Sequence, residues 1–320
     1  MNIIEEYMKA NWMDISGTNV LPDKFAVLKL GGQSSSKSPL NLSVFTGGER
    51  PRYLIKMNRG AADFKAIEDE FKNLKRIGVS LRQACGCLLP EAVHFAKIDG
   101  FTLILVETFL PGKKVSLANF SELSLLFSKA FGWLKEFYLI TRKGKADIGF
   151  QDVVLPFAAP ERLKRKLEII SNKLCARGDL EIPISSCQGD FDFDNILLSK
   201  NNIAIVDWED YAEAKSPFFD AEFFVFNAAM YYYKEDGHIK SLEKYFLKSS
   251  KTYKLADTCI SDYCKFLGVD KSMFYIVSIL DTINMIACGH GRHRCVPMQS
   301  MDFLEKLIDL TIRESGLTDV

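Results

Sequence analysis

Apolar and polar residues alternate in the first third of the chain in a pattern that predicts a small β-rich region. Short runs rich in aliphatic and aromatic residues are separated by Gly, Ser and Pro, as is typical of β-strands joined by turns. The predicted strands are residues 24–30, 41–45, 52–57 and 101–109. Between the third and fourth runs, apolar residues recur at helical spacing, which predicts one helix over residues 61–77.

Helical periodicity dominates after the segment LPGKK at 110–114. The predicted helices are residues 116–139, 160–176, 217–233, 239–255, 270–288 and 299–314. The exception is a pair of short apolar runs within 195–208, joined at the turn-forming pair Asn201 and Asn202, which predicts a hairpin. The expected fold is therefore α+β with two lobes. A small β-rich N-terminal lobe with one main helix and an N-terminal helix covers 1–108, and a larger, mostly helical lobe covers 109–320.

Composition and charge restrict the function. The chain has 320 residues, enough for two domains, and its 41 basic and 41 acidic residues give zero formal net charge. A general nucleic-acid-binding or membrane-surface protein normally carries a basic excess, so neither partner is expected. No apolar stretch is long enough to cross a bilayer. Eight cysteines without a secretory leader indicate reduced thiols in a cytoplasmic protein. The sequence does not indicate an oligomeric state.

The predicted hairpin carries many acidic side chains. Asp190, Asp192 and Asp194 precede its first strand, and Asp207 follows its second. A solvated acidic turn is one explanation of such a cluster. The neighbouring apolar runs favour another, because they place the carboxylates and the Asn195 amide at the ends of buried strands. Oxygen ligands at such a position suit Mg²⁺, which usually shares them with phosphates.

The segment QGDFDFDNILL, followed by IVDWED, resembles the catalytic loop and metal-binding strand of the aminoglycoside phosphotransferase and choline kinase family, which has a protein-kinase-like fold. Asp190 and Asn195 have the spacing of the kinase catalytic loop. The resemblance implies that Asp190 orients the acceptor hydroxyl and accepts its proton, and that Asn195 and Asp207 bind Mg²⁺. Asp220 matches a family aspartate that opens a helix and braces this loop. Gln188 stands where the family usually has His, which implies altered support of the loop and not lost chemistry.

The same resemblance assigns phosphate-binding residues to the first lobe. Lys56, in the run 52–57, matches the lysine that contacts the α- and β-phosphates. Glu70, in the predicted helix, matches the glutamate that pairs with this lysine. Glu68 is the competing candidate, but it follows Ile67 directly and faces elsewhere on the helix.

Two further segments are assigned to the nucleotide. Residues 31–38, GGQSSSKS, are one residue short of a Walker loop, lack its second Gly and precede a predicted strand instead of a helix. They are expected to form a turn that closes over the phosphates through backbone N–H groups and the hydroxyls of Ser34 and Ser35. The segment VETFLPG at 106–112 resembles the connector between the two lobes of this family, and its Glu107 carbonyl and Phe109 N–H are expected to face a purine. The family usually uses ATP and some members accept GTP; the sequence does not choose between them.

The sequence therefore predicts an ATP- and Mg²⁺-dependent kinase of a small-molecule hydroxyl. The interval between Asp207 and Asp220 leaves little room for the activation segment of a protein kinase, which disfavours a peptide acceptor. A sugar or glycan-type acceptor is preferred, then an amino alcohol such as choline. An aminoglycoside ranks third because the predicted helix at 160–176, assigned to the acceptor pocket, is basic. The alternatives are a pseudokinase or nucleotide-binding regulatory protein, and a kinase of a polymer or protein.

The segment CGHGRHRC at 288–295 carries two Cys and two His in one short stretch. Structural zinc sites normally draw their ligands from two separated pairs, so zinc is disfavoured. An anion-binding turn at a helix end is a second interpretation. A Gly-rich helix terminator with solvated basic residues is the preferred one.

Overall fold

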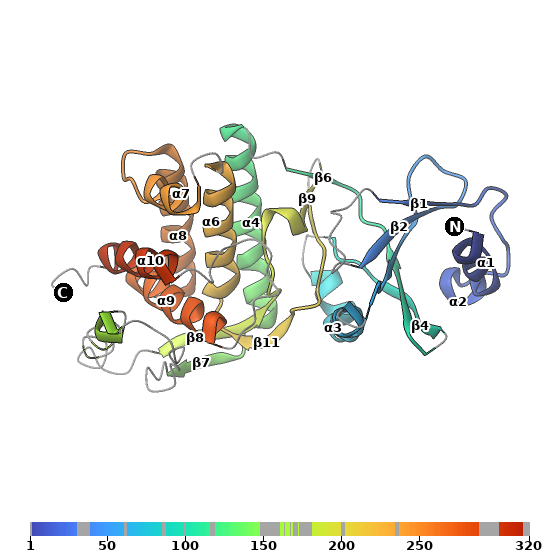
Figure 1. Ribbon diagram of the computed structural model, residues 1–320, viewed down its shortest axis with the longest axis horizontal. Helices are drawn as coiled ribbons and strands as arrows, with labels where there is room; N and C mark the ends of the chain where they lie inside the picture. Colours follow the sequence, from blue (N-terminus) through green and yellow to red (C-terminus); the bar gives the residue numbers. More distant parts are fainter. Residues whose placement is uncertain are drawn as a thin grey trace. The chain divides into compact units, whose positions relative to one another are not determined.

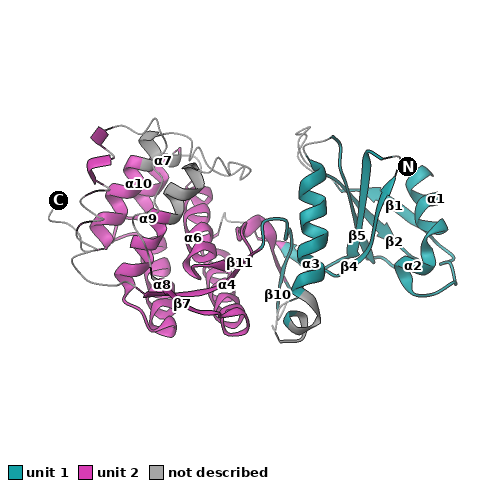
Figure 2. Ribbon diagram, turned by 90° about the horizontal axis from the view of Figure 1, so that it is seen from below, with its two compact units in different colours: residues 1–113, 199–211 teal, residues 114–198, 212–320 magenta. Residues whose placement is uncertain are grey.

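The computed structural model describes residues 2–30, 39–60, 63–84, 88–98, 100–115, 119–147, 161–162, 164–166, 168, 172, 181–199, 202–233, 237–287 and 301–315 (Figure 1). The chain divides into two compact units. Unit 1 comprises Met1–Lys113 and Ser199–Tyr211, and unit 2 comprises Lys114–Leu198 and Ala212–Val320 (Figure 2). The turn predicted at 31–38, with Ser34 and Ser35, and the segment 288–295 lie outside the described residues.

Unit 1 is built on a five-stranded antiparallel sheet with the strand order β1-β2-β3-β5-β4. The strands are β1 (Ala26–Lys29), β2 (Leu40–Phe45), β3 (Tyr53–Met57), β4 (Ala92–Ile98) and β5 (Thr102–Thr108). The four predicted strands are confirmed, whereas the edge strand β4 was not predicted. Most β4 side chains are only partly buried, so its sequence lacks the alternation of buried and exposed residues that identifies a strand.

Helices cover the two faces of this sheet. α1 (Asn2–Ala10) and α2 (Trp12–Ser16) lie on one side, and α3 (Phe64–Ala84) lies on the other (Figures 1 and 2). Met8 and Trp12 pack with the strand residues Ile55 and Val106 in one hydrophobic cluster. Because successive strand residues point to opposite faces, Lys56 is directed toward α3. The apolar cluster thus anchors the sheet and leaves its second face for polar side chains.

The segment that ends in Asp207 belongs to unit 1 although it comes late in the sequence. Its strand β10 (Ile203–Ile205) is fully buried. Leu88 donates its N–H to the Ile203 carbonyl at 2.9 Å and accepts the Ile205 N–H at 3.1 Å. These backbone bonds hold β10, and with it the following Asp207, in place within unit 1.

Unit 2 is mostly helical. Its helices are α4 (Phe120–Thr141), α6 (Phe218–Tyr232), α7 (His238–Tyr245), α8 (Lys251–Leu267), α9 (Lys271–Ala287) and α10 (Met301–Glu314). A three-stranded antiparallel sheet, with the order β11-β8-β7, was not predicted; it consists of β7 (Gly144–Asp147), β8 (Glu181–Cys187) and β11 (Ala212–Lys215). Two short strands, β6 (Lys113–Lys114) and β9 (Ile196–Leu198), and the 3₁₀ helix η3 (Phe193–Asn195) complete the described elements. Within the described residues, no helix is long and apolar enough to span a bilayer.

The helix predicted over 239–255 is wrong in extent. α7 ends at Tyr245, and α8 begins at Lys251 and continues to Leu267. The Ser250 hydroxyl accepts the Tyr253 N–H at 3.0 Å and caps the start of α8. The apolar period continues across the break, so it could not reveal where one helix ends and the next begins.

Candidate active site

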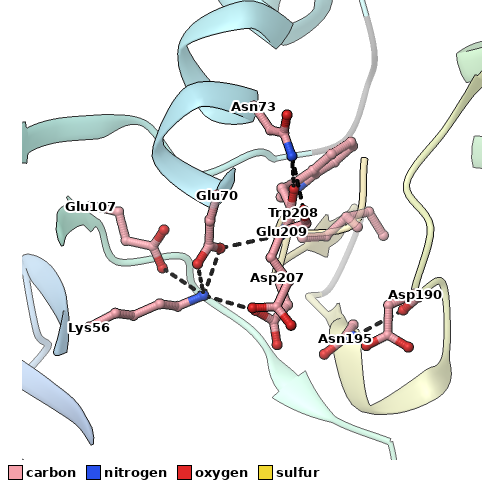
Figure 3. Close-up of polar contacts among 10 residues, drawn as sticks. Lys56, Glu70, Asn73, Glu107, Asp190, Asn195, Asp207, Trp208 and Glu209 are labelled. Carbon is pink, nitrogen blue, oxygen red and sulfur yellow. Dashed lines mark hydrogen bonds and ion pairs between the residues drawn. The ribbon is translucent and has the colours of Figure 1, made fainter. Parts of the chain in front are cut away.

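Three carboxylates surround one ammonium group in unit 1 (Figure 3). Lys56 Nζ donates to both carboxylate oxygens of Glu70, at 2.6 and 2.7 Å. It also donates to Asp207 Oδ1 at 3.1 Å and lies 3.9 Å from Glu107 Oε1. Glu68 is instead paired with Lys72 at 3.3 Å. The ion pair expected between Lys56 and Glu70, in preference to Glu68, is confirmed.

Burial and charge act in opposite directions on Lys56. Burial lowers the pKa of its ammonium, and the carboxylates of Asp207, Glu107 and Glu70 more than offset this effect, so the pKa lies well above its usual value. Lys56 is therefore charged at any physiological pH. The charged ammonium of Lys56 lies beside the half-exposed carboxylate of Asp207. An ammonium in this position is suited to contact a phosphate.

Helix α3 fixes the backbone that follows Asp207. Glu70 Oε1 accepts the Trp208 N–H at 3.2 Å, and one turn later Asn73 Nδ2 donates to the carbonyls of Trp208 (2.8 Å) and Glu209 (3.1 Å). Asp207 has a φ of 63°, in the left-handed region that few non-glycine residues adopt. Strain of this kind persists only where surrounding contacts enforce it, and the bonds from α3 supply them.

In unit 2 the aspartates of the segment 190–194 have different partners. Asn195 Nδ2 donates to the Asp190 carbonyl and to Asp190 Oδ2, both at 2.9 Å. Asp192 is buried and caps η3, because its Oδ1 accepts the N–H groups of Asp194 (2.7 Å) and Asn195 (3.1 Å). Asp194 pairs with the exposed Lys114 at 3.3 Å. Like charges are tolerated here because each carboxylate points to its own partner.

Phenylalanines between these aspartates hold the segment in the core. Phe191 is fully buried and stacks on Trp133 of α4, with ring centroids 4.8 Å apart. Phe193 contacts Tyr231 of α6 edge-on at 4.3 Å. Sequence reasoning overlooked this role, although the strict alternation of Asp and Phe from 190 to 194 was its signal.

The turn before Asp190 is held by Asp220, as the resemblance implied. The Asp220 carboxylate accepts the Gln188 N–H at 2.7 Å and the Gly189 N–H at 2.9 Å. Gly189 has a φ of 94°, which a side chain would strain. Gln188 Oε1 accepts the Asp190 N–H at 2.8 Å, so Gln188 supports the loop from the position where the family usually has His. Burial raises the pKa of Asp220 to about 7 despite the two backbone bonds.

The connector differs from its prediction. The Phe109 N–H, expected to face a purine, donates to the Arg52 carbonyl at 3.0 Å and so extends the pairing of β3 with β5. Glu107 was assigned through its carbonyl, yet its side chain is buried and lies near Lys56. The hydrophobic pattern did not predict the buried position of this side chain. Glu107 follows four consecutive buried apolar residues, so no alternation indicates the face of the strand on which it lies.

The residues assigned to a metal offer suitable ligands. The Asp207 side chain is 43% exposed. Both N–H groups of the Asn195 amide are directed to Asp190, so its oxygen is the atom of this amide that a cation could bind. Among the described residues, no group of three His, Cys, Asp or Glu side chains is arranged to hold a metal.

Comparisons with known proteins identify the fold. No model of a known protein family matches the sequence, and no curated protein does. Among solved structures, the aminoglycoside phosphotransferase APH(4)-Ia is 12% identical with a TM-score of 0.54, and the match covers 97% of this chain and 99% of that one. The choline kinase LicA from Streptococcus pneumoniae is 13% identical with a TM-score of 0.54, covering 98% of each chain. The amicoumacin kinase hAmiN is 13% identical with a TM-score of 0.51, covering 98% of this chain and 94% of that one.

These likenesses extend over nearly the whole chain. The chain therefore has the α+β, protein-kinase-like fold of aminoglycoside phosphotransferases and choline kinases, as the sequence resemblance predicted. Fold alone does not define a reaction, so the function has to be argued from the residues of the site.

Proposed function

We propose that the protein is an ATP- and Mg²⁺-dependent phosphotransferase that acts on a hydroxyl group of a small molecule. The observation that carries the proposal is the Lys56 ammonium held by Glu70 with both carboxylate oxygens while it also contacts Asp207. This arrangement keeps a charged group beside a half-exposed carboxylate. The Asp190–Asn195 pair in unit 2 supplies a second carboxylate held by a hydrogen bond.

Each residue has a role that follows from its contacts. Lys56 binds the phosphates of the nucleotide, and Glu70 keeps its ammonium in position. Asp190 orients the acceptor hydroxyl and takes its proton as the phosphoryl group is transferred; in a loose transition state orientation contributes more than basicity. Asp207 and the Asn195 amide oxygen would hold Mg²⁺, which when bound neutralises charge on the phosphates.

Known structures with this fold support the choice of ligands. One APH(4)-Ia structure contains ADP and hygromycin B, and the amicoumacin kinase structure contains AMP-PNP, Ca²⁺ and the ligand Ami. We propose ATP as the donor, with GTP as the alternative. An acceptor with a sugar-type hydroxyl or an amino alcohol is proposed for this chain.

The basic charge of residues 160–176, which disfavours an aminoglycoside acceptor, is partly paired with acidic side chains. Arg162 pairs with Glu305 at 2.8 Å, and Lys166 pairs with Glu305 at 3.2 Å and with Asp309. Acidic residues of α10 therefore neutralise part of this basic charge. An aminoglycoside accordingly belongs in any panel of acceptors.

A cytoplasmic location is part of the proposal. Among the described residues, Cys259 and Cys264 are free thiols, and a reducing compartment keeps thiols in this form. A nucleotide-binding protein without catalytic activity is the second candidate function. Turnover, and not binding, separates the two.

Nucleotide binding is the first test. Thermal unfolding of the wild type should shift upward with ATP plus Mg²⁺ and much less with ATP alone, because a ligand that binds only the folded state stabilises it. Asp207→Ala should remove the extra shift due to Mg²⁺. Asp194→Ala, which removes an exposed carboxylate of the acidic segment, is the matched control and should keep it. Equal shifts with and without Mg²⁺ in the wild type would contradict the proposal.

A further inference from the structure

Glu107 is an acidic residue in an apolar environment. The four residues before it, Leu103 to Val106, are buried, and Glu107 itself is 1% exposed. One oxygen, Oε1, lies 3.9 Å from Lys56 Nζ, beyond hydrogen-bond distance. The other, Oε2, is buried and has no hydrogen-bond partner among the described residues. An unsatisfied buried acceptor costs about 1–3 kcal/mol, so its presence calls for a partner that the described chain does not supply.

The sheet register fixes the face on which Glu107 stands. Lys56 pairs with Leu105, and Leu54 pairs with Glu107. Paired residues of antiparallel strands share a face, and so do residues two apart in one strand. Glu107 therefore stands on the same face as Lys56, one step further along β5 toward the connector (Figure 3).

Glu107 is not needed to hold Lys56. Glu70 already contacts the ammonium with both oxygens, and Asp207 contacts it at 3.1 Å. Burial raises the pKa of Glu107 to about 8, and the ammonium of Lys56 offsets only part of this effect. The side chain is thus a hydrogen-bonding group with at least one acceptor oxygen left for a ligand.

We propose that the Glu107 carboxyl accepts a hydrogen bond from the 6-amino group of a purine and selects ATP over nucleotides with a 6-keto base. This inference rests on the proposed function, in which Lys56 binds the phosphates. Glu107 lies at the end of β5, where the connector begins, so a nucleotide with its phosphates at Lys56 and its base at the connector brings that base to Glu107.

The test compares ATP with ITP, which carries a 6-keto base in place of the 6-amino base. Affinities are measured by calorimetry with Mg²⁺ at pH 9, above the Glu107 pKa of about 8, where the carboxylate can only accept hydrogen bonds. The proteins compared are the wild type, Glu107→Met and Glu107→Gln. The wild type should prefer ATP by about tenfold, the value of one hydrogen bond of about 1.4 kcal/mol. Glu107→Met should lose most of this preference through weaker ATP binding. Glu107→Gln should also lose it, through stronger ITP binding, because its amide can donate to a keto oxygen.

Controls separate the possible failures. Leu105→Met changes a buried side chain on the same face of β5 and should keep the preference for ATP. The ratio of wild-type affinity to Glu107→Met affinity should be the same for 2′-deoxy-ATP as for ATP, because Glu107 is proposed to contact the base and not the ribose. Equal affinities for ATP and ITP in the wild type, or an unchanged ratio in the folded Glu107→Gln variant, would overturn this inference alone. A wild type that binds neither nucleotide would overturn the proposed function with it.

Discussion

Buried carboxylates in this protein are stabilised in two different ways. Glu70 is held by the ammonium of Lys56, whereas Asp220 is held by two backbone N–H groups and no cation within hydrogen-bond distance in the described residues. Burial raises the pKa of both carboxyls, and the pKa of Asp220 rises to about 7 because two neutral donors compensate only part of the desolvation of a charge. Asp220 is therefore the side chain most able to make unit 2 sensitive to pH.

The sign of this dependence follows from linkage. A carboxyl whose pKa is about 7 when folded and near 4 when unfolded binds more protons in the folded state between these values. Its contribution to stability is full below about pH 4 and is lost as the pH rises through 7. We expect urea unfolding to show a smaller difference between pH 5 and pH 8 for Asp220→Asn than for the wild type. Parallel pH profiles for the two proteins would show that Asp220 does not titrate in this range.

Residue-level prediction worked where a particular side chain is needed for chemistry. The pair of Lys56 with Glu70 and the brace from Asp220 were implied by the family resemblance and are present. The Phe109 N–H was assigned wrongly, and the Glu107 side chain was overlooked. Their environment depends on strand register, which sets the face of a side chain and the partner of an amide and which the sequence does not reveal.

At the level of elements, η3 is the part of unit 2 that positions Asn195. Asp192 caps η3 with two hydrogen bonds. The side chain of Asp194, two residues later, forms a surface ion pair with Lys114. Loss of the cap leaves two backbone N–H groups without an acceptor at a largely buried position. The order of importance of these aspartates is thus set by burial and not by charge.

Alanine substitution of these two aspartates provides a matched comparison. Asp192→Ala should lower the free energy of unfolding by at least about 1 kcal/mol, and Asp194→Ala should change it by less than about 0.5 kcal/mol. Asp192→Asn keeps an acceptor oxygen and should recover most of the loss. Denaturant unfolding monitored by circular dichroism measures all three. If Asp194→Ala proved as destabilising as Asp192→Ala, the capping assignment would be wrong.

Elements with strong periodicity were predictable, and others were not. α9 and α10 match their predicted spans within two residues because each has an apolar stripe over more than three turns. β8 has seven residues, but a proline and two serines interrupt its apolar pattern. β7 and β11 have four residues each and are defined by their pairing with β8. The sequence signal of such a strand is too brief to be separated from that of a loop.

For the whole molecule, the fold persists with few identical residues. APH(4)-Ia and LicA share 12–13% of their residues with this chain over almost its full length. A core requires apolar side chains of suitable size in the right pattern, which many sequences satisfy. A phosphotransfer site requires particular groups, so Lys56, Glu70, Asp190, Asn195 and Asp207 carry the functional argument.

Transfer of labelled γ-phosphate from ATP to a panel of acceptors tests the central claim most directly. The panel contains sugars, choline and related amino alcohols, and aminoglycosides, each with and without Mg²⁺. The wild type should transfer phosphate to at least one acceptor only when Mg²⁺ is present. Asp190→Asn should bind ATP with wild-type affinity and transfer phosphate at least about 100-fold more slowly, since it loses the group that takes the hydroxyl proton. Normal transfer by Asp190→Asn, with Asp192→Asn or Asp194→Asn inactive, would contradict the assignment of the loop.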